Sequence, residues 1–72
     1  MQEVEIYQQP VELYKILKFE GMVSSGAEAK KAIEQGQVFV NDTVERRKRR
    51  KIIAGDKITF ADQHICIRFV PR

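Results

Sequence analysis

The sequence predicts an α+β domain in which two packed helices lie against a small antiparallel sheet. Apolar residues recur at helical spacing between residues 11 and 36, and they alternate with polar residues on both sides of this stretch. Glycine, asparagine and aspartate stand between the segments, where turns are expected. With 72 residues and no segment of linker composition, we expect one domain over residues 1–72. A core of this size is thin, so a deep catalytic cleft is not expected.

A strand and a short helix are predicted at the start of the chain. Polar and apolar residues alternate over residues 3–7, so Val4 and Ile6 are expected to face the core from a strand. Pro10 is expected in the first turn of a helix over residues 11–20, where an N–H group is not needed. The apolar face of this helix consists of Leu13, Ile16 and Leu17.

A second helix is predicted between Ser25 and Gly36. Ser25 and Glu28 fit a capping box, in which each side chain accepts a hydrogen bond from the backbone N–H of the other residue. Gly21 is expected to end the first helix with a positive φ, as glycine commonly does. The packed face of the second helix consists of Ala29, Ala32, Ile33 and Gly36.

Short strands separated by tight turns are predicted after residue 36. The strands are expected over residues 38–40, 43–44 and 57–60, followed by a last strand that ends near Pro71. The turns are expected at Asn41-Asp42, Gly55-Asp56 and Asp62-Gln63. In the last strand the residues that point one way are Ile65, Ile67 and Phe69.

Six consecutive cationic residues form what we call the basic run. They are Arg46, Arg47, Lys48, Arg49, Arg50 and Lys51. The formal net charge is +3 with 13 Lys and Arg; without the run, seven basic residues face ten acidic ones, a net charge of −3. Positive charge confined to one segment favours a polyanionic partner over a solvated basic loop without a partner. Arginine holds phosphate with two hydrogen bonds and stacks on bases, which favours structured RNA.

The sequence offers little for catalysis or metal binding. His64 and Cys66 are two apart on a predicted strand, but the chain has no other histidine or cysteine, and a structural zinc needs four ligands. Glycines are scattered, so no phosphate loop is formed. We therefore expect no enzyme, catalytic residue, metal, cofactor or small-molecule substrate, and Cys66 buried or half-buried. No apolar run is long enough to span a membrane, so no membrane partner and a cytoplasmic location are expected.

The segment over residues 11–60 resembles the RNA-binding domain named after small-subunit ribosomal protein four, the S-four domain. The residues that carry the resemblance are Leu13, Leu17, Gly21, Ser25, Ala29, Lys30, Ile33, Gly36, residues 38–42, Val44 and residues 55–58. The N-terminal strand, the basic run and the length are similar to the stand-alone bacterial YbcJ family, in which this domain is the whole protein. The resemblance implies the αL-type RNA-binding fold. Two positions depart from the family pattern: Gly26 stands where an arginine is frequent, and Asp42 follows Asn41 where a glycine is frequent.

The candidate RNA-binding residues lie on the second helix and in the basic run. The first turn of this helix offers free N–H groups and the positive end of the helix dipole, and Gly26 allows a phosphate to approach closely. Lys30 and Lys31 extend the positive surface, although both also fit solvated helix positions, and Ser25 also fits a cap alone. The resemblance places the basic run beside the same face. In an extended run alternate side chains diverge, so about three of the six cations are expected to contact RNA at once.

Four aromatic residues could stack on bases, but in so small a chain we expect them in the core. They are Tyr7, Tyr14, Phe19 and Phe39. Their pattern does not resemble the stacking platform of a sheet-type RNA reader.

The expected function is non-catalytic binding of structured RNA, ribosomal or transfer RNA, in RNA maturation or ribosome assembly, with the ribosome as an expected associate. The alternative is a protein-interaction adaptor whose basic run docks an acidic protein partner, and Gly26 in place of arginine keeps this alternative open. DNA is a third candidate, since phosphates alone do not distinguish the nucleic acids.

Overall fold

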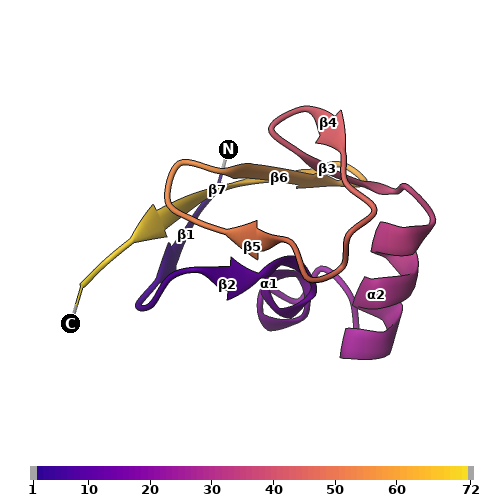
Figure 1. The fold of residues 1–72 in the computed structure, drawn as a ribbon, viewed down its shortest axis with the longest axis horizontal. Coiled ribbons are helices and arrows are strands. Elements are labelled where there is room, and N and C mark those ends of the chain that lie inside the picture. The colour runs from indigo at the N-terminus through magenta and orange to yellow at the C-terminus, as the bar shows by residue number, and fades with distance from the viewer. Residues whose placement is uncertain (1, 72) are drawn as a thin grey trace.

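The computed structural model describes residues 2–71 and contains two helices, a five-stranded sheet and a separate two-stranded sheet (Figure 1). The elements in chain order are β1 (Gln2–Ile6), β2 (Val11–Glu12), α1 (Leu13–Phe19), α2 (Gly26–Glu34), β3 (Val38–Val40), β4 (Thr43–Val44), β5 (Lys51–Ile52), β6 (Lys57–Phe60) and β7 (Gln63–Phe69). The large sheet has the order β1-β7-β6-β3-β4, and β2 pairs with β5. The α+β class and the two helices packed against the sheet are confirmed.

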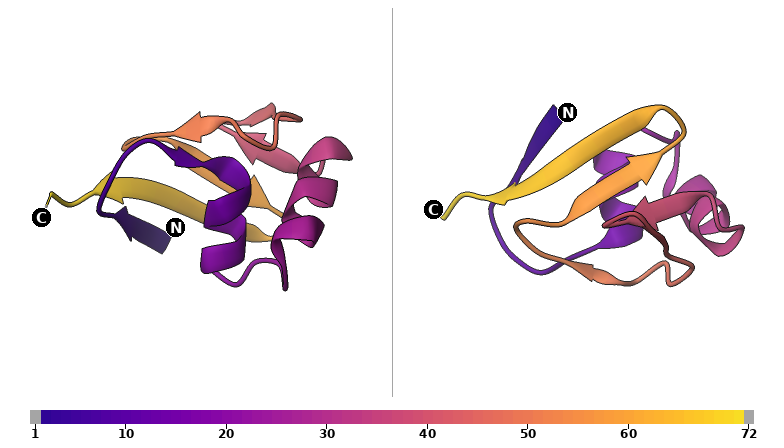
Figure 2. Two further views of the ribbon diagram at one scale, coloured as in Figure 1. Left: turned by 60° about the horizontal axis from the view of Figure 1, so that its bottom comes forward. Right: turned by 90° about the horizontal axis from the view of Figure 1, so that it is seen from above.

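The sheet is mixed, because the first strand is parallel to its neighbour. β1 runs parallel to β7. The other neighbouring pairs, β7 with β6, β6 with β3 and β3 with β4, are antiparallel. The first and last strands of the chain thus lie side by side, and both helices lie in the connection between β1 and β3 (Figures 1 and 2). The prediction of an antiparallel sheet therefore holds for three of the four strand pairs.

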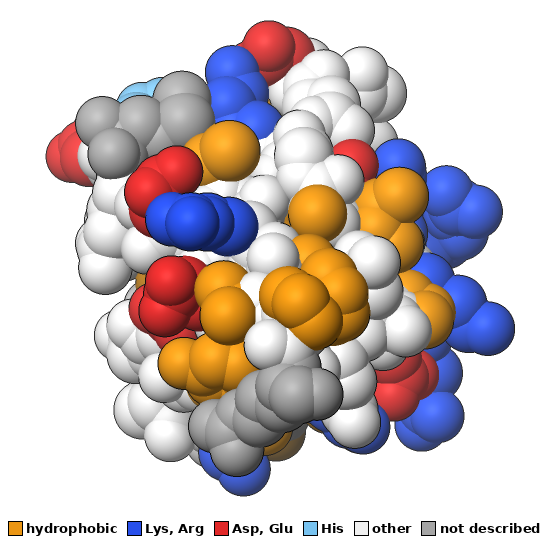
Figure 3. Space-filling view, turned by 90° about the vertical axis from the view of Figure 1, so that its left-hand side faces the viewer, with side chains coloured by type: hydrophobic (Ala, Val, Ile, Leu, Met, Phe, Trp, Pro, Cys, Tyr) orange, Lys and Arg blue, Asp and Glu red, His pale blue; other side chains and the backbone are white. Residues whose placement is uncertain are grey.

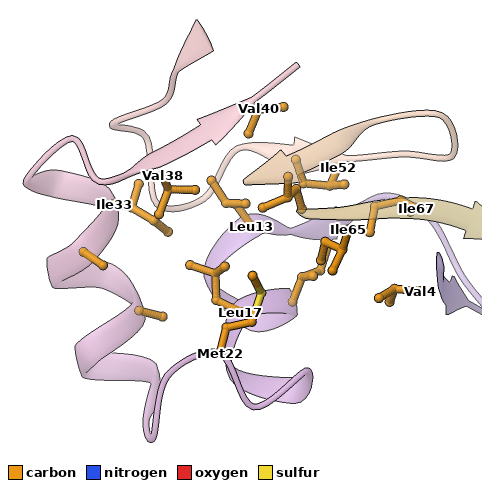
Figure 4. Close-up of a cluster of buried hydrophobic side chains, with 14 of the residues drawn as sticks. Val4, Leu13, Leu17, Met22, Ile33, Val38, Val40, Ile52, Ile65 and Ile67 are labelled. Atoms are coloured by element: carbon orange, nitrogen blue, oxygen red, sulfur yellow. The ribbon is translucent and has the colours of Figure 1, made fainter. Parts of the chain in front are cut away.

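The core lies between the helices and one face of the sheet, as Figure 4 shows. Its largest fully buried side chains are Leu13, Leu17, Ile33, Ile52, Ile58, Ile67, Val38 and Val40. On β1 the buried residues are Val4 and Ile6, as the alternating pattern predicts. Burying one Val, Leu or Ile side chain contributes about 1.5 to 3 kcal/mol relative to leaving it exposed.

The first helix begins later than predicted, at Leu13 rather than residue 11. Residues 11–12 form β2 and pair with Lys51, the last residue of the basic run, and with Ile52, which follows it. Pro10 therefore lies outside the helix. The expectation that Pro10 occupies the first helical turn is wrong. The reason is tertiary: a strand partner from far along the chain takes the two residues that local propensity assigns to the helix.

The ends of both helices agree with the sequence. At Gly21, with φ 70°, the chain leaves α1, and the N–H of Met22 donates to the carbonyl of Leu17 at 3.0 Å. Gly36, with φ 77°, ends α2 in the same way. Glycine is favoured at both positions because other residues adopt a positive φ at a cost in energy. Neither helix among residues 2–71 is long and apolar enough to cross a membrane.

One of the three predicted turns lies where expected, and the other two are each shifted by one residue, the turn before β6 to residues 54–55. Asn41 and Asp42 both have positive φ, 53° and 68°, which confirms the type I′ hairpin. The last hairpin turns at residues 61–62, because Gln63 already pairs with Phe60. Moving this turn by one residue would shift the register of β7 and point its apolar residues away from the core.

Candidate nucleic-acid interface

The basic run is folded into a turn and not extended. Lys48 and Arg49 form the turn, and the N–H of Arg50 donates to the carbonyl of Arg47 at 3.1 Å. Lys51 then enters β5. The expected divergence of alternate side chains along an extended segment is therefore wrong. Which cations face the solvent depends instead on what each side chain contacts.

A buried carboxylate determines the shape of the basic run. Glu45, only 6% exposed, accepts hydrogen bonds from the backbone N–H of Arg47 at 3.0 Å and from its Nε and Nη2 at 3.0 and 3.1 Å. Arg50 Nη1 donates to the same carboxylate at 2.7 Å. The Arg47 hydrogen bonds, with a smaller contribution from Arg50, lower the pKa of Glu45 to about 2. Two of the six cations thus share one carboxylate within the domain, which balances one of their two charges.

Glu45 was not among the residues that the sequence singled out. The one feature of the sequence that could have identified it is its position, because this acidic residue immediately precedes the basic run. A carboxylate is buried only when it is paired, and the two arginines that follow it provide the pairing. The N–H of Glu45 donates to the carbonyl of Val38 at 2.9 Å, which attaches the start of the run to β3.

Backbone hydrogen bonds attach the run to the start of α1. The N–H of Leu13 donates to the carbonyl of Arg50 at 2.9 Å, and the N–H of Tyr14 donates to the carbonyl of Lys48 at 3.1 Å. The first N–H groups of a helix have no partner within the helix, so these carbonyls satisfy them. The run is consequently held at three places, at β3, at α1 and at β5.

The other four cations of the run do not pair with Glu45 among the described residues. The guanidinium of Arg46 lies against the C-terminal end of α2, where a Cβ added to Gly36 would be 2.8 Å from Arg46 Nη1. Lys48 Nζ lies 3.1 Å from Glu34 of α2, in an exposed ion pair. The other two are Arg49, whose Nη1 is 3.9 Å from Glu12, and Lys51, which is exposed.

Tyr14 connects the run to the N-terminal half of α2. Its backbone N–H donates to the carbonyl of Lys48, while its ring lies under Lys30, whose Nζ is 4.7 Å from the ring centroid. A Cβ added to Gly26 would be 3.9 Å from the same ring, an ordinary contact. The structure thus brings Gly26 and Lys30 to the side of α1 on which the run lies. Sequence reasoning considered Tyr14 only for base stacking or the core.

Ser25 acts as the cap of α2. Its Oγ accepts from the N–H of Glu28 at 3.1 Å, and the Glu28 carboxylate accepts from the N–H of Ser24, not of Ser25, at 3.1 Å. One half of the predicted capping box is therefore confirmed, and the other half is displaced by one residue. The hydrogen bonds from Ser24, helped by Lys31, lower the pKa of Glu28. Lys31 is exposed and close enough to Glu28 for its charge to act on that carboxylate.

Three of the four aromatic residues expected in the core are exposed. Phe19, Tyr7 and Phe39 are 70%, 47% and 37% exposed, while Tyr14 is half-buried against the core. Phe39 alternates with the buried residues of β3 and so points to the opposite face of the sheet. The expectation of buried aromatics is wrong for these three residues.

The histidine and the cysteine lie on β7 with their side chains on the side opposite its buried residues. His64 is exposed, with Nδ1 3.2 Å from Thr59 Oγ1, and Cys66 is half-buried as predicted. Across residues 2–71 there is no group of three or more His, Cys, Asp and Glu side chains that could hold a metal ion.

Comparison with known proteins places this arrangement in a family. The model of the S4 domain, the S-four domain of the motifs above, matches residues 4–68. YbcJ of Escherichia coli (strain K12) and YbcJ of Shigella flexneri are each 53% identical over 55 residues, covering 76% of this chain and 79% of theirs. The solution structure of YbcJ from Escherichia coli, which has an αL motif involved in RNA binding, matches with a TM-score of 0.71 and 46% identity, covering 93% of this chain and 86% of that one. The chain therefore belongs to the S4 domain family.

Proposed function

We propose that this domain binds structured RNA without catalysing a reaction, through a surface formed by the basic run and the N-terminal half of α2. The observation that carries the proposal is the buried Glu45, which holds the run in one shape through Arg47 and Arg50. A solvated basic loop would not need a buried carboxylate. A preformed cationic surface loses less conformational entropy when it binds a folded RNA.

Four cations of the run remain for phosphate contacts after the two that Glu45 binds. They are Arg46, Lys48, Arg49 and Lys51. Lys30 adds a charge beside them, over the Tyr14 ring. In α2 the N–H groups of Gly26 and Ala27 have no hydrogen-bond partner among the described residues, so they are available to donate to a phosphate. The expected ligand is ribosomal or transfer RNA in the cytosol, during RNA maturation or ribosome assembly.

The test is the binding of labelled RNA by fluorescence anisotropy over a series of salt concentrations. The ligands are an RNA hairpin with a helical junction, an unstructured RNA strand and a DNA duplex of equal charge. We expect the structured RNA to bind most tightly, with a log–log salt slope of about −3 to −4 for about four contacts. Equal, weak binding of all three that disappears at physiological salt would refute the proposal and favour an acidic protein partner.

A pair of double variants locates the surface. Arg46→Glu with Arg49→Glu is expected to abolish RNA binding and leave the fold intact, because both side chains are exposed. Lys18→Glu with Arg68→Glu is the matched control, since it changes the charge equally at exposed positions of α1 and β7 outside the run. If both double variants weaken binding to the same degree, net charge alone explains the binding and the site assignment is wrong.

A further inference from the structure

β1 presents an unpaired strand edge. It lies at the end of the five-stranded sheet and pairs with β7 on one side only (Figure 2). The carbonyl of Ile6 accepts from the N–H of Val70 at 2.8 Å, so the backbone polar groups of Ile6 and Val4 point toward β7. Those of Glu3 and Glu5 point to the outer side, where no other strand of residues 2–71 pairs. Such an edge can accept an additional strand.

An open apolar groove lies beside this edge. It has a volume of about 720 Å³ and is formed by β1, the segment that follows it and α1. Its apolar side chains include Ile6, Pro10, Val11, Ile16 and Phe19. Phe19 is the most exposed large apolar side chain among the described residues, at 70%. An extended segment added along β1 would cover this groove with alternate side chains.

The charges around the groove are mainly acidic. Glu5, Glu12 and Glu20 line it together with one cation, Lys15, and Lys15 Nζ pairs with Glu12 at 3.2 Å. Neither Glu5 nor Glu20 forms an ion pair within the described part of the chain, although Arg68 is the strand neighbour of Glu5. Figure 3 shows this side of the molecule: apolar side chains gather in its centre, acidic side chains lie mainly to the left with a basic one between them, and most basic side chains lie to the right.

The acidic side chains restrict the occupant. RNA is excluded because its phosphates would face Glu5 and Glu20. A second copy that paired its own β1 with this β1 would bring Glu3 and Glu5 opposite their equivalents, and like charges directly opposite one another destabilise a strand pair. A strand with basic side chains would instead be attracted.

We propose that the edge of β1 and this groove bind an extended segment of another protein in which apolar residues alternate with Lys or Arg. Side chains of an added strand alternate between its two faces. Those in line with Val4 and Ile6 face the groove and Phe19, and those in line with Glu3 and Glu5 face the carboxylates. The site goes beyond the proposed RNA binding, because its charge is opposite to that of the basic run and its partner is a basic protein segment.

The experiment uses the full chain and a short labelled peptide of alternating Lys and Val with blocked ends. We expect saturable binding with a dissociation constant below about 100 µM, and changes in amide NMR shifts that concentrate in β1 and α1. Glu3→Lys with Glu5→Lys is expected to weaken binding at least about fivefold. The matched control, Glu34→Lys with Asp62→Lys, makes the same charge change at exposed positions outside the groove and is expected to leave the affinity within about twofold.

Two further peptides separate pairing from simple charge attraction. A peptide with Glu in place of Lys is expected not to bind, and a central Pro is expected to abolish binding because it removes a backbone N–H. The proposal is overturned by equal binding of the acidic peptide, by shift changes confined to the basic run, or by no saturable binding up to about 1 mM. The proposal would also be overturned if the chain forms a dimer and the double variant Glu3→Lys with Glu5→Lys changes the stability of that dimer. A second copy would then occupy the edge.

Discussion

Replacing Glu45 by glutamine removes the negative charge on which the shape of the basic run depends and leaves a side chain of nearly the same size. The amide keeps one acceptor oxygen, but its NH₂ group faces the donors of Arg47 and Arg50. The two guanidinium groups then lose their shared partner. We expect the run to lose its fixed turn while the core remains folded.

The expected loss of stability follows from the pKa of Glu45. Its lowering from 4.5 to about 2 corresponds to about 3 kcal/mol between the charged and neutral forms. The Arg47 side chain is 75% exposed, so solvent screens part of this energy, and we expect about 2 kcal/mol. In a domain of this length that lowers the Tm by about 8 to 16 °C.

The pH dependence of stability gives a second readout. Because the pKa of Glu45 is lower in the folded state, the unfolded state binds more protons and stability rises with pH. The contribution of Glu45 is complete above about pH 5 and is lost as the pH falls through about 2. The difference in stability between the wild type and Glu45→Gln should therefore shrink over this range.

The effect on RNA binding separates loop shape from net charge. Glu45→Gln makes the protein more positive, so electrostatics alone predicts tighter binding. We expect weaker binding, by about threefold or more, because the run is no longer preformed. Glu34→Gln is the matched control: it adds the same charge beside Lys48 but breaks only an exposed ion pair, so stability should change by less than about 0.5 kcal/mol.

Thermal melts of both variants measure the change in stability. Anisotropy titrations, at a temperature at which each variant is folded, measure the change in RNA affinity. If Glu45→Gln binds RNA more tightly than the wild type, or melts within about 2 °C of it, the structural role assigned to Glu45 is refuted.

Three further substitutions test local features of the fold by thermal or urea unfolding. Gly36→Ala should cost about 1 to 2 kcal/mol, because φ is positive there and the added Cβ would meet the Arg46 guanidinium; an unchanged midpoint would contradict this. Ser25→Ala should cost about 1 kcal/mol through loss of the hydrogen bond from Glu28, and a neutral result would show that the cap is dispensable. Asn41→Gly keeps the positive φ but loses the hydrogen bonds of the side chain to the turn before β6, so we expect about 1 kcal/mol, whereas stabilisation would show that these bonds contribute nothing.

Local features of this protein follow from the sequence because they depend on neighbouring residues. Alternation of polar and apolar residues identified β1, β3 and β7, since successive side chains of a strand point to opposite faces. Gly21 and the Asn41-Asp42 pair marked positions where the backbone needs a positive φ. These choices involve only a few consecutive residues, so no knowledge of the rest of the fold is needed.

Pairings between distant segments do not follow from such patterns. The parallel pairing of β1 with β7 joins the two ends of the chain, and β2 exists only because β5 lies beside it. The sequence pattern around Pro10 therefore predicts a helix, although α1 begins only at Leu13.

In the candidate site too, some properties follow from the sequence and others only from the tertiary structure. The composition of the basic run and its preference for a polyanion could be seen in the sequence, because charge is a property of the residues themselves. Tertiary structure decided which partner each cation has: Glu45 is buried and binds Arg47 and Arg50, and Tyr14 brings Lys30 toward the run. Burial is set by packing of segments from the whole chain, and here that packing removes the Glu45 carboxylate from water, where it is stable only when paired.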